Sequence, residues 1–350
     1  MKRIIIFCAF LFGVNVSSAQ NLGDVILGSD DASTLLQNYL SPAMKGLMSS
    51  MNGGWYSTAK THKKLGFDIT FGLNASFTPD KDKVFEFIAD DYNFLSIADG
   101  GSTSIPTVLG KDNTNTAFNV SIPYQGGNFK SGTFELPGGI AKDLPASAVP
   151  APFVQVGLGL PFKTTIKLRY VPKTGFASKV NANLIGVGLQ HDLTQYLGLI
   201  GKLPFSVSLL GAYTSATIDY TIQNGDLSNQ VSVTNGLAQF KVKTWTVQAL
   251  GSLDFQIVTL YGGIGFNGGT STFKVNGDYD LTYQEVSSSR LDQGTTNTES
   301  ISDPISLKFK STGTRATLGA RLNLTFFKIF ADYTLQEYNT ATLGFAFSFR

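Results

Sequence analysis

The sequence is poor in cysteine and in charge, and it has no long apolar run after its first twenty residues. Cys8 is the only cysteine among 350 residues, which excludes a disulfide scaffold. Charged residues make up 15% of the chain and hydrophobic residues 42%, which is not the composition of a disordered protein. A helical membrane protein is also excluded, because each spanning helix needs about 18 or more consecutive apolar residues.

The first residues predict export. Lys2 and Arg3 precede an apolar run that ends in small residues at Ala19, so residues 1–19 are expected to be a signal peptide cleaved before Gln20. An N-terminal membrane anchor is the alternative. Cleavage would lower the Lys plus Arg count from 27 to 25, equal to the 25 Asp plus Glu. A neutral chain of this kind is not expected to bind nucleic acid, which requires an excess of cations.

Residues that could carry chemistry are few. The two histidines, His62 and His191, stand in no recognisable order with a serine and a carboxylate, and no metal-ligand cluster occurs. Gly263, Gly265 and Gly268 match a dinucleotide-binding fingerprint by letters, but the segment continues as a strand where that motif needs a helix. We interpret these glycines as allowing strand curvature or close approach of an inner segment. The sequence therefore predicts neither an enzyme nor a cofactor.

Apolar residues alternate with polar or glycine residues through most of the chain, which is the period of a β-strand. Several of these segments run ten residues or more, whereas a transmembrane β-strand needs about 9–11. The pattern predicts an all-β, transmembrane antiparallel β-barrel with its apolar face toward lipid. A soluble β-protein is the alternative. The alternating segments are 64–77, 151–160, 163–172, 180–190, 204–222, 238–253, 256–275, 305–326, 328–337 and 341–349.

The number of strands follows from parity. Segment 83–90 is an eleventh candidate, and bacterial barrels have an even number of strands, so Thr116 to Tyr124 is expected to supply the twelfth. The sequence thus predicts about 12 strands, within a range of 10–14. Connections near 160–164, 253–256 and 326–328 are short and are expected to face the periplasm. The connections near 222–238 and 276–305 are long and polar and are expected to be extracellular.

Residues 20–62 do not alternate, and they carry a motif made of Asp31, Ala32, Ser33, Ser41, Pro42 and Ala43. This segment resembles the N-terminal plug of the FadL-like outer-membrane transporters of long-chain fatty acids. In that family an acidic-Ala-Ser stretch precedes an Asn-Pro-Ala motif, and Ser41 stands here in place of the asparagine. The resemblance implies a plug inside the barrel and passage of small hydrophobic molecules. An amphipathic helix resting on a soluble sheet is the alternative.

The expected organisation is a signal peptide at 1–19, a plug at 20–62, and at 63–350 an outer-membrane barrel with long polar extracellular loops. The expected partners are outer-membrane lipid, a small hydrophobic ligand and the barrel-assembly machinery. The rival function is a barrel that does not transport and scaffolds a secretion or surface-assembly complex. A continuous apolar path with a lateral opening would favour transport, and a sealed lumen packed with charge pairs would favour the scaffold.

Charged residues on the polar face of the strands are expected to point into the lumen, because a charge facing lipid costs about 2–4 kcal/mol near the midplane. They either form a structural network or contact a ligand. These residues are Asp68, Lys167, Arg169, Arg315, Arg321, Lys328 and Asp332. The last strand ends in Phe345, Phe347 and Phe349, which resemble the C-terminal insertion signal of barrel proteins, although here Arg350 follows the final aromatic residue. An ordinary final strand is the alternative.

Overall fold

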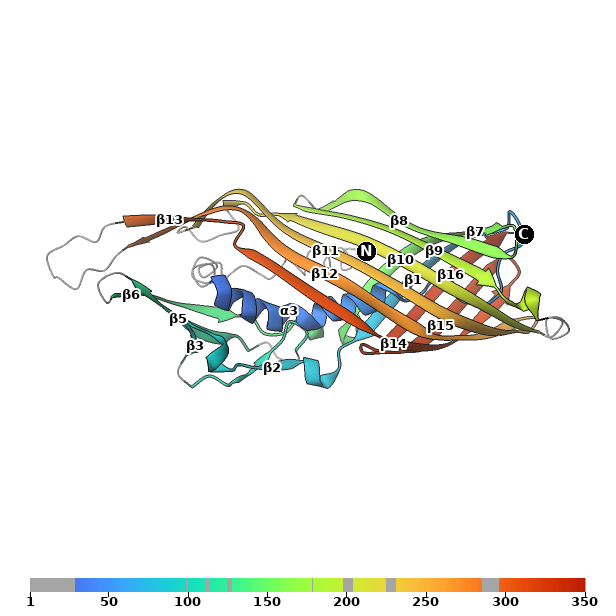
Figure 1. The fold of residues 1–350 in the computed structure, drawn as a ribbon, viewed down its shortest axis with the longest axis horizontal. Coiled ribbons are helices and arrows are strands. Elements are labelled where there is room, and N and C mark those ends of the chain that lie inside the picture. Colours follow the sequence, from blue (N-terminus) through green and yellow to red (C-terminus); the bar gives the residue numbers. More distant parts are fainter. Residues whose placement is uncertain are drawn as a thin grey trace.

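The computed structural model describes residues 29–98, 100–110, 114–124, 128–177, 179–197, 204–224, 231–284 and 296–349. The expected signal peptide, residues 1–19, lies outside them. The described residues form one long α-helix, a large antiparallel sheet and two small sheets (Figure 1). No helix among the described residues is long and apolar enough to cross a membrane.

Ten long strands form a ring-like sheet. Hydrogen-bonded neighbours follow the order β11-β10-β9-β8-β7-β1-β16-β15-β14-β12, and β12 pairs in turn with β11. All of these pairings are antiparallel, and the first strand in sequence pairs with the last. The ring strands are β1 (Phe67–Phe77), β7 (Ala148–Leu160), β8 (Thr164–Ala177), β9 (Val180–Asp192), β10 (Phe205–Thr221), β11 (Val231–Asp254), β12 (Val258–Gln284), β14 (Ile305–Leu324), β15 (Phe327–Leu335) and β16 (Thr340–Phe349).

The two ends of the ring differ. At the tight-turn end, residues 161–163, 255–257 and 325–326 connect neighbouring strands. At the opposite end, which we call the loop end, β11 and β12 continue well beyond the other strands, and β13 (Thr296–Ser302) pairs with the far part of β12. These extensions run through segments that the polar composition assigns to loops. They form strands because ladder hydrogen bonds join backbone groups whatever the side chains are.

Two predicted strands are absent from the ring. Segment 83–90 contains only β2 (Val84–Glu86), which pairs with β4 (Ser104–Pro106). Thr116–Tyr124 is a strand, β5, but it pairs with β3 (Leu95–Ile97) and β6 (Asn128–Leu136). The expectation of twelve ring strands was therefore too high by these two, and the observed ten lies at the lower end of the expected range. The alternation in β5 marks a buried face, but this face packs against the long α-helix in the apolar core at one end of the ring.

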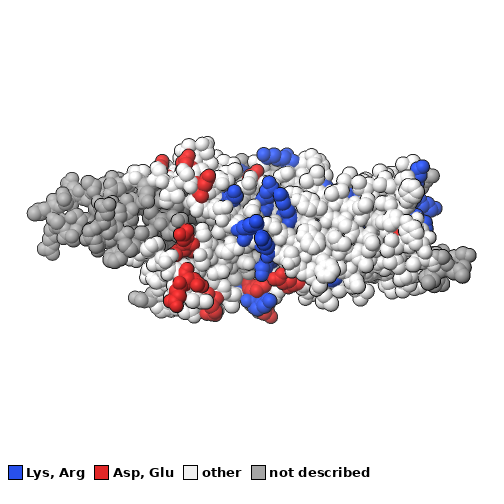
Figure 2. Space-filling view, in the orientation of Figure 1, with Lys and Arg blue, Asp and Glu red and all other residues white. Residues whose placement is uncertain are grey.

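The ring exposes apolar side chains outward and buries polar ones inside. On β7, Val154, Val156 and Leu158 are 38–41% exposed, whereas Gln155 between them is 3% exposed. The same reversal recurs on the other ring strands, with Leu318 at 75% and Ile264 at 68% exposure. Figure 2 shows that charged side chains are sparse over the half of the ring toward the tight-turn end. This is the opposite of the arrangement in a soluble β-protein.

Helix α3 (Ser29–Met51) lies along the inside of the ring in Figure 1 and contacts β1, β7, β11, β12 and β14. Asp30 and Asp31 lie in its first turn, where negative charge favours helix formation. Leu35, Tyr39 and Ala43 follow at spacings of four residues, and all three are buried. Pro42 lies within the helix and removes one backbone donor from it.

The interior is filled by two clusters of buried side chains. At the loop end, α3 packs with the small sheets and with the inner faces of the extended strands, including Phe118 of β5, Phe240 of β11 and Phe309 of β14. Toward the tight-turn end, a smaller cluster forms around Trp55 and Tyr56, which follow the helix.

Residues 63–66 then join the helix-bearing segment directly to β1. There Leu65 N–H donates to the Gly159 carbonyl at 2.9 Å, and Gly159 N–H donates to the Gly66 carbonyl at 2.8 Å.

Candidate functional site

The C-terminal end of α3 is held by an arginine from the ring wall. Arg169 of β8 donates to the carbonyl oxygens of Met51 at 3.2 Å and Gly53 at 2.8 Å. Its Nε also donates to the Gln155 side chain at 3.1 Å, and its guanidinium lies 3.8 Å from the centre of the Trp55 ring. The last carbonyls of a helix have no intrahelical partner and carry the negative end of the helix dipole. A buried cation at this position both donates hydrogen bonds to these carbonyls and balances the negative end of the helix dipole.

Two further cations act on the same stretch of backbone. Arg315 of β14 donates to the Asn52 carbonyl at 2.8 Å, and Lys167 of β8 donates to the Trp55 carbonyl at 2.5 Å. Arg169, Arg315 and Lys167 are 2%, 4% and 8% exposed. Three buried cations from two sides of the ring thus converge on residues 51–55.

The Trp55 side chain fits against glycines of β9. Side chains at Gly186 and Gly188 would place a Cβ 3.2 Å and 2.9 Å from the Trp55 ring. Gly188 therefore admits the indole only because it has no side chain. Some of the many glycines in the ring strands are therefore points where an inner side chain packs closely against the wall.

Tyr56 makes the equivalent contact on β12. A Cβ at Gly263 would lie 2.4 Å from the Tyr56 hydroxyl, so the interpretation of this glycine as a point of close approach is confirmed. Tyr56 donates to the Gln248 side chain at 3.2 Å, and its ring packs edge-on against Tyr261. The Tyr261 hydroxyl donates to Asp332 of β15 at 2.9 Å.

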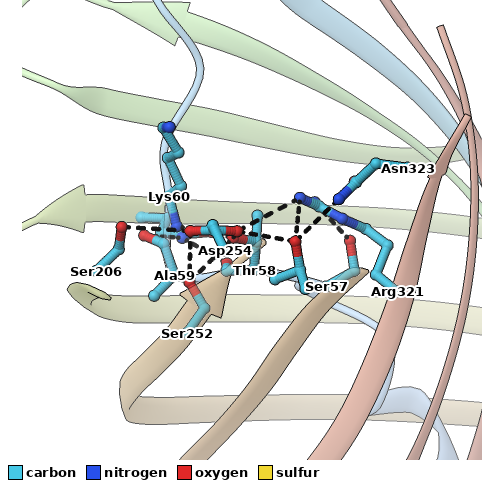
Figure 3. Close-up of polar contacts among 11 residues, drawn as sticks. Ser57, Thr58, Ala59, Lys60, Ser206, Ser252, Asp254, Arg321 and Asn323 are labelled. Carbon is cyan, nitrogen blue, oxygen red and sulfur yellow. Dashed lines mark hydrogen bonds and ion pairs between the residues drawn. The ribbon is translucent and has the colours of Figure 1, made fainter. Parts of the chain in front are cut away.

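A polar network around Asp254 holds the next residues at the tight-turn end (Figure 3). The Asp254 carboxylate accepts hydrogen bonds from Thr58 at 3.4 Å and Thr259 at 2.9 Å, and it lies 3.9 Å from the guanidinium of Arg321. Ser206 and Ser252 donate to its other oxygen. Sequence reasoning missed Asp254, whose only signal is that it ends β11 on the same face as the buried side chains.

The remaining predicted charges lie at the same end. Asp68 of β1 pairs with His62 at 2.9 Å and accepts from Thr70 at 2.9 Å. Lys328 lies opposite Asn323 in the pairing of β14 with β15. Within the part of the chain that the structure describes, none of the seven predicted charges forms an ion pair with another of the seven. Arg169, Arg315 and Lys167 instead bind backbone oxygens of the N-terminal segment.

All six residues of the N-terminal motif lie in α3. The Asp31 carboxylate accepts the backbone N–H groups of Asn93, Phe94 and Leu95 at 2.6–3.0 Å, and its side chain is buried. It therefore ties the start of the helix to the segment that leads into β3. The other five motif residues, Ala32, Ser33, Ser41, Pro42 and Ala43, are buried or half-buried along the helix.

The C-terminal aromatic residues lie on β16. Phe349 stacks on Phe67 with ring centres 5.0 Å apart, and Phe345 stacks on Phe71 at 5.3 Å. Phe347 contacts Phe327 of β15. These rings line the seam between the first and last ring strands, and the insertion signal stays a prediction.

At the loop end, Tyr338 joins the β15–β16 connection to the short 3-10 helix Asp80–Asp82 that precedes β2. Its hydroxyl donates to the Asp82 carboxylate at 2.7 Å. Burial, together with this acidic partner, raises the pKa of Tyr338 above its usual value. The phenol therefore remains a hydrogen-bond donor well into the alkaline range.

Fold and inner contacts together define an all-β protein whose ring-like sheet holds its own N-terminal helix. The chain belongs to a family described as a family of unknown function (DUF6588), whose sequence pattern matches residues 1–349. No curated protein matches the chain.

Among solved structures, the chain is similar to Ail, the attachment invasion locus protein of Yersinia pestis, with 12% identity, a TM-score of 0.26, and coverage of 82% of this chain and 100% of that one. It is also similar to the translocator domain of the autotransporter NalP from Neisseria meningitidis, with 11% identity, a TM-score of 0.28 and coverage of 83% and 90%. The Pseudomonas putida toluene transporter TodX has 8% identity, a TM-score of 0.22 and coverage of 81% and 89%. At these TM-scores none of the three supports an argument about the function of this chain.

Proposed function

We propose that this protein is an outer-membrane β-barrel in which residues 29–62 form a plug, and that movement of the plug opens a passage for small hydrophobic molecules. The outward apolar face supports the membrane location. On β11 the outer apolar run extends from Trp245 to Leu253, which matches the length of about 9–11 residues that a tilted strand needs. The resemblance of the motif from Asp31 to Ala43 to the FadL-like plug supports the same proposal.

One observation carries the idea of a movable plug. Apart from the small apolar cluster around Trp55 and Tyr56, residues 52–62 are held by hydrogen bonds between wall side chains and plug backbone. Examples are Arg315 to Asn52 and Gln190 to Ala59. Water can replace such bonds at a net cost of about 0.5–1.5 kcal/mol each, or more where the partner is charged. Helix α3, in contrast, is seated in the apolar core at the loop end. The proposed gate is therefore residues 52–62, with α3 as its fixed support.

Hydrophobic cargo is supported by the apolar side chains at the loop end, which α3 and the small sheets cover in this structure. The inner faces of the extended strands there are apolar, with Phe240 and Val242 on β11 and Leu307 on β14. The inner face toward the tight-turn end is mixed: Gln190, Gln248 and threonines lie beside the small apolar cluster around Trp55 and Tyr56. A hydrophobic molecule would be favoured at the entrance and would pass this half only when residues 52–62 move.

Two experiments test the barrel and the plug separately. Heat-modifiable gel migration after detergent extraction is expected for a barrel, and solubility without detergent would refute the membrane location. Deletion of residues 21–60 is expected to raise single-channel conductance in a planar bilayer above that of the full chain. Unchanged conductance with intact heat-modifiability would remove the plug from the proposal.

Cargo is tested by uptake into cells. Radiolabelled toluene and medium-chain fatty acids are expected to cross an outer membrane that carries the protein faster than one that lacks it, whereas a labelled disaccharide is not. Equal acceleration of all three solutes would indicate an unselective pore, and no acceleration would refute transport.

The scaffold function is the second candidate, favoured by one observation. Residues 51–62 contact β1, β8, β9, β11 and β14, so the wall is engaged from several sides at once. A permanently filled ring suits a barrel that anchors a secretion or surface-assembly complex. A stable hetero-complex in native membranes, together with unchanged conductance after the deletion, would favour this function.

A further inference from the structure

Five exposed lysines gather on the outer face of three adjacent ring strands. We call them the lysine patch: Lys241 and Lys243 of β11, Lys274 of β12, and Lys308 and Lys310 of β14. In Figure 2 a blue cluster lies near the middle of the molecule, at the border of the region that is poor in charge. Two rows cross the strands here, with Lys241 and Lys308 flanking Thr272, and Lys243 and Lys310 flanking Thr270.

One acidic side chain of the described residues, Asp219 of β10, lies beside the lysine patch but is not ion-paired to it. None of the five lysines forms an ion pair with a described residue, and the β10 partners of Lys241 and Lys243 are Thr217 and Ser215. Asp219 lies opposite Gln239, two residues before Lys241, and accepts a hydrogen bond from the Gln239 side chain. Unpaired like charges so close together repel each other, and an anion bound across the strands would remove this cost.

The lysine patch lies at the edge of the apolar outer face. The next outward residue after Lys243 on β11 is Trp245, which is 41% exposed, and aromatic side chains mark the membrane–water boundary in barrels. Farther down these three strands, and extending onto β15, small residues leave a hollow of about 520 Å³ in the outer wall. Its lining includes Ala249, Gly262, Ile264, Ala316, Leu318 and Tyr333.

The spacing between the lysine patch and this hollow fits one kind of molecule. Lys243 and Ala249 are six residues apart, as are Lys310 and Ala316, which is about 20 Å along a strand. With the usual strand tilt of about 35–45°, the depth below the lysines is roughly 15 Å, half of a hydrocarbon core of about 30 Å. An acyl chain whose head group rests on the lysines would therefore end in the hollow.

We propose that the lysine patch and the hollow together form a binding site for a phosphorylated, multiply acylated glycolipid of the outer leaflet. This inference rests on the proposed function, because it takes the apolar outer face as the membrane face. Lysines two strands apart are about 10 Å from each other at the backbone, so the site suits a head group with two separated phosphates. The acyl chains lie along β11, β12 and β14 down to the hollow.

The test uses the purified full chain in a nonionic detergent, titrated with bisphosphorylated lipid A and followed by native mass spectrometry. The triple variant Lys243→Gln, Lys308→Gln, Lys310→Gln is expected to bind roughly 100-fold more weakly, since each lysine near an anionic lipid surface contributes about fivefold. A matched control removes three exposed lysines elsewhere, Lys64→Gln, Lys142→Gln and Lys163→Gln, and is expected to bind as the unmodified chain does.

Two further experiments test whether the ligand is an acylated lipid. Ala249→Phe fills the hollow and is expected to weaken binding of the acylated lipid severalfold while leaving the lysines intact. Inorganic pyrophosphate is expected not to compete at millimolar concentration, and effective competition would overturn the assignment to a lipid. Equal losses in the triple variant and in its control, or no loss in either, would overturn the site. Heat-modifiable migration distinguishes failure of the lipid site from failure of the barrel. A triple variant that still migrates in this way is folded, so its binding reports on the site. Absence of this migration in the unmodified chain would instead refute the barrel.

Discussion

Replacing Arg169 with methionine should release residues 52–62 from the ring wall without opening the ring. The substitution removes two hydrogen bonds from a charged donor, to the carbonyls of Met51 and Gly53. Bonds of this kind contribute about 1.5–3 kcal/mol each, and the contact with the Trp55 ring adds about 1 kcal/mol. The lower end of this range, a loss of about 4 kcal/mol, corresponds to a roughly 1,000-fold larger population of the displaced segment.

Thiol labelling measures this population. Ala59 is 0% exposed and lies within the released segment, so an Ala59→Cys variant with Cys8 changed to serine reports each opening. Maleimide labelling of this cysteine should be about 1,000-fold faster with Arg169→Met than with Arg169 present. Lys243→Met removes one outward cation as a control and should leave the labelling rate unchanged. Slow labelling in Arg169→Met, with heat-modifiable migration intact, would refute the view that this arginine holds the segment.

Three smaller perturbations probe other contacts. Asp31→Asn should lower the free energy of unfolding by about 2 kcal/mol, because an amide cannot accept all the backbone N–H groups that the carboxylate binds, and hydrogen exchange should accelerate at residues 93–95. Gly188→Ala should cost about 1–3 kcal/mol by pressing on Trp55, and the additional change Trp55→Leu should recover part of it in thermal unfolding. Tyr338→Phe should cost about 1.5 kcal/mol in denaturant unfolding by leaving Asp82 without its donor, whereas an unchanged midpoint would show that water replaces the phenol.

The ring could be predicted because its two faces meet different surroundings, and side chains alternate between them. Period two in β7 or β14 is sufficient to identify a strand and its apolar face. It does not identify the neighbouring strand, because the ladder is made by backbone groups. Phe118 and Val120 of β5 alternate as they would in the ring, yet they pack against the core around α3. Only the three-dimensional arrangement separates the two cases.

The contacts of the candidate site could be predicted less well from the sequence than the ring could. Alternation predicts the face on which Arg169 and Arg315 lie, but their partners are backbone carbonyls, which every residue possesses. No residue pattern therefore marks Met51, Asn52 and Gly53 as acceptors. The glycine content was a partial signal, since aromatic side chains of residues 55 and 56 approach Gly188 and Gly263 closely.

The short junction at residues 63–66 limits how residues 52–62 could move. The segment is fixed at one end by α3 in its apolar core and at the other by the hydrogen bonds of Leu65 and Gly66 to Gly159. About twelve residues separate these two anchors, a contour of roughly 40 Å when fully extended. The segment is thus anchored at both ends. It can be displaced sideways within the ring, but it cannot leave the ring. If the protein transports as proposed, a solute would pass beside the segment, and the width of the gap on that side would set the largest solute that crosses.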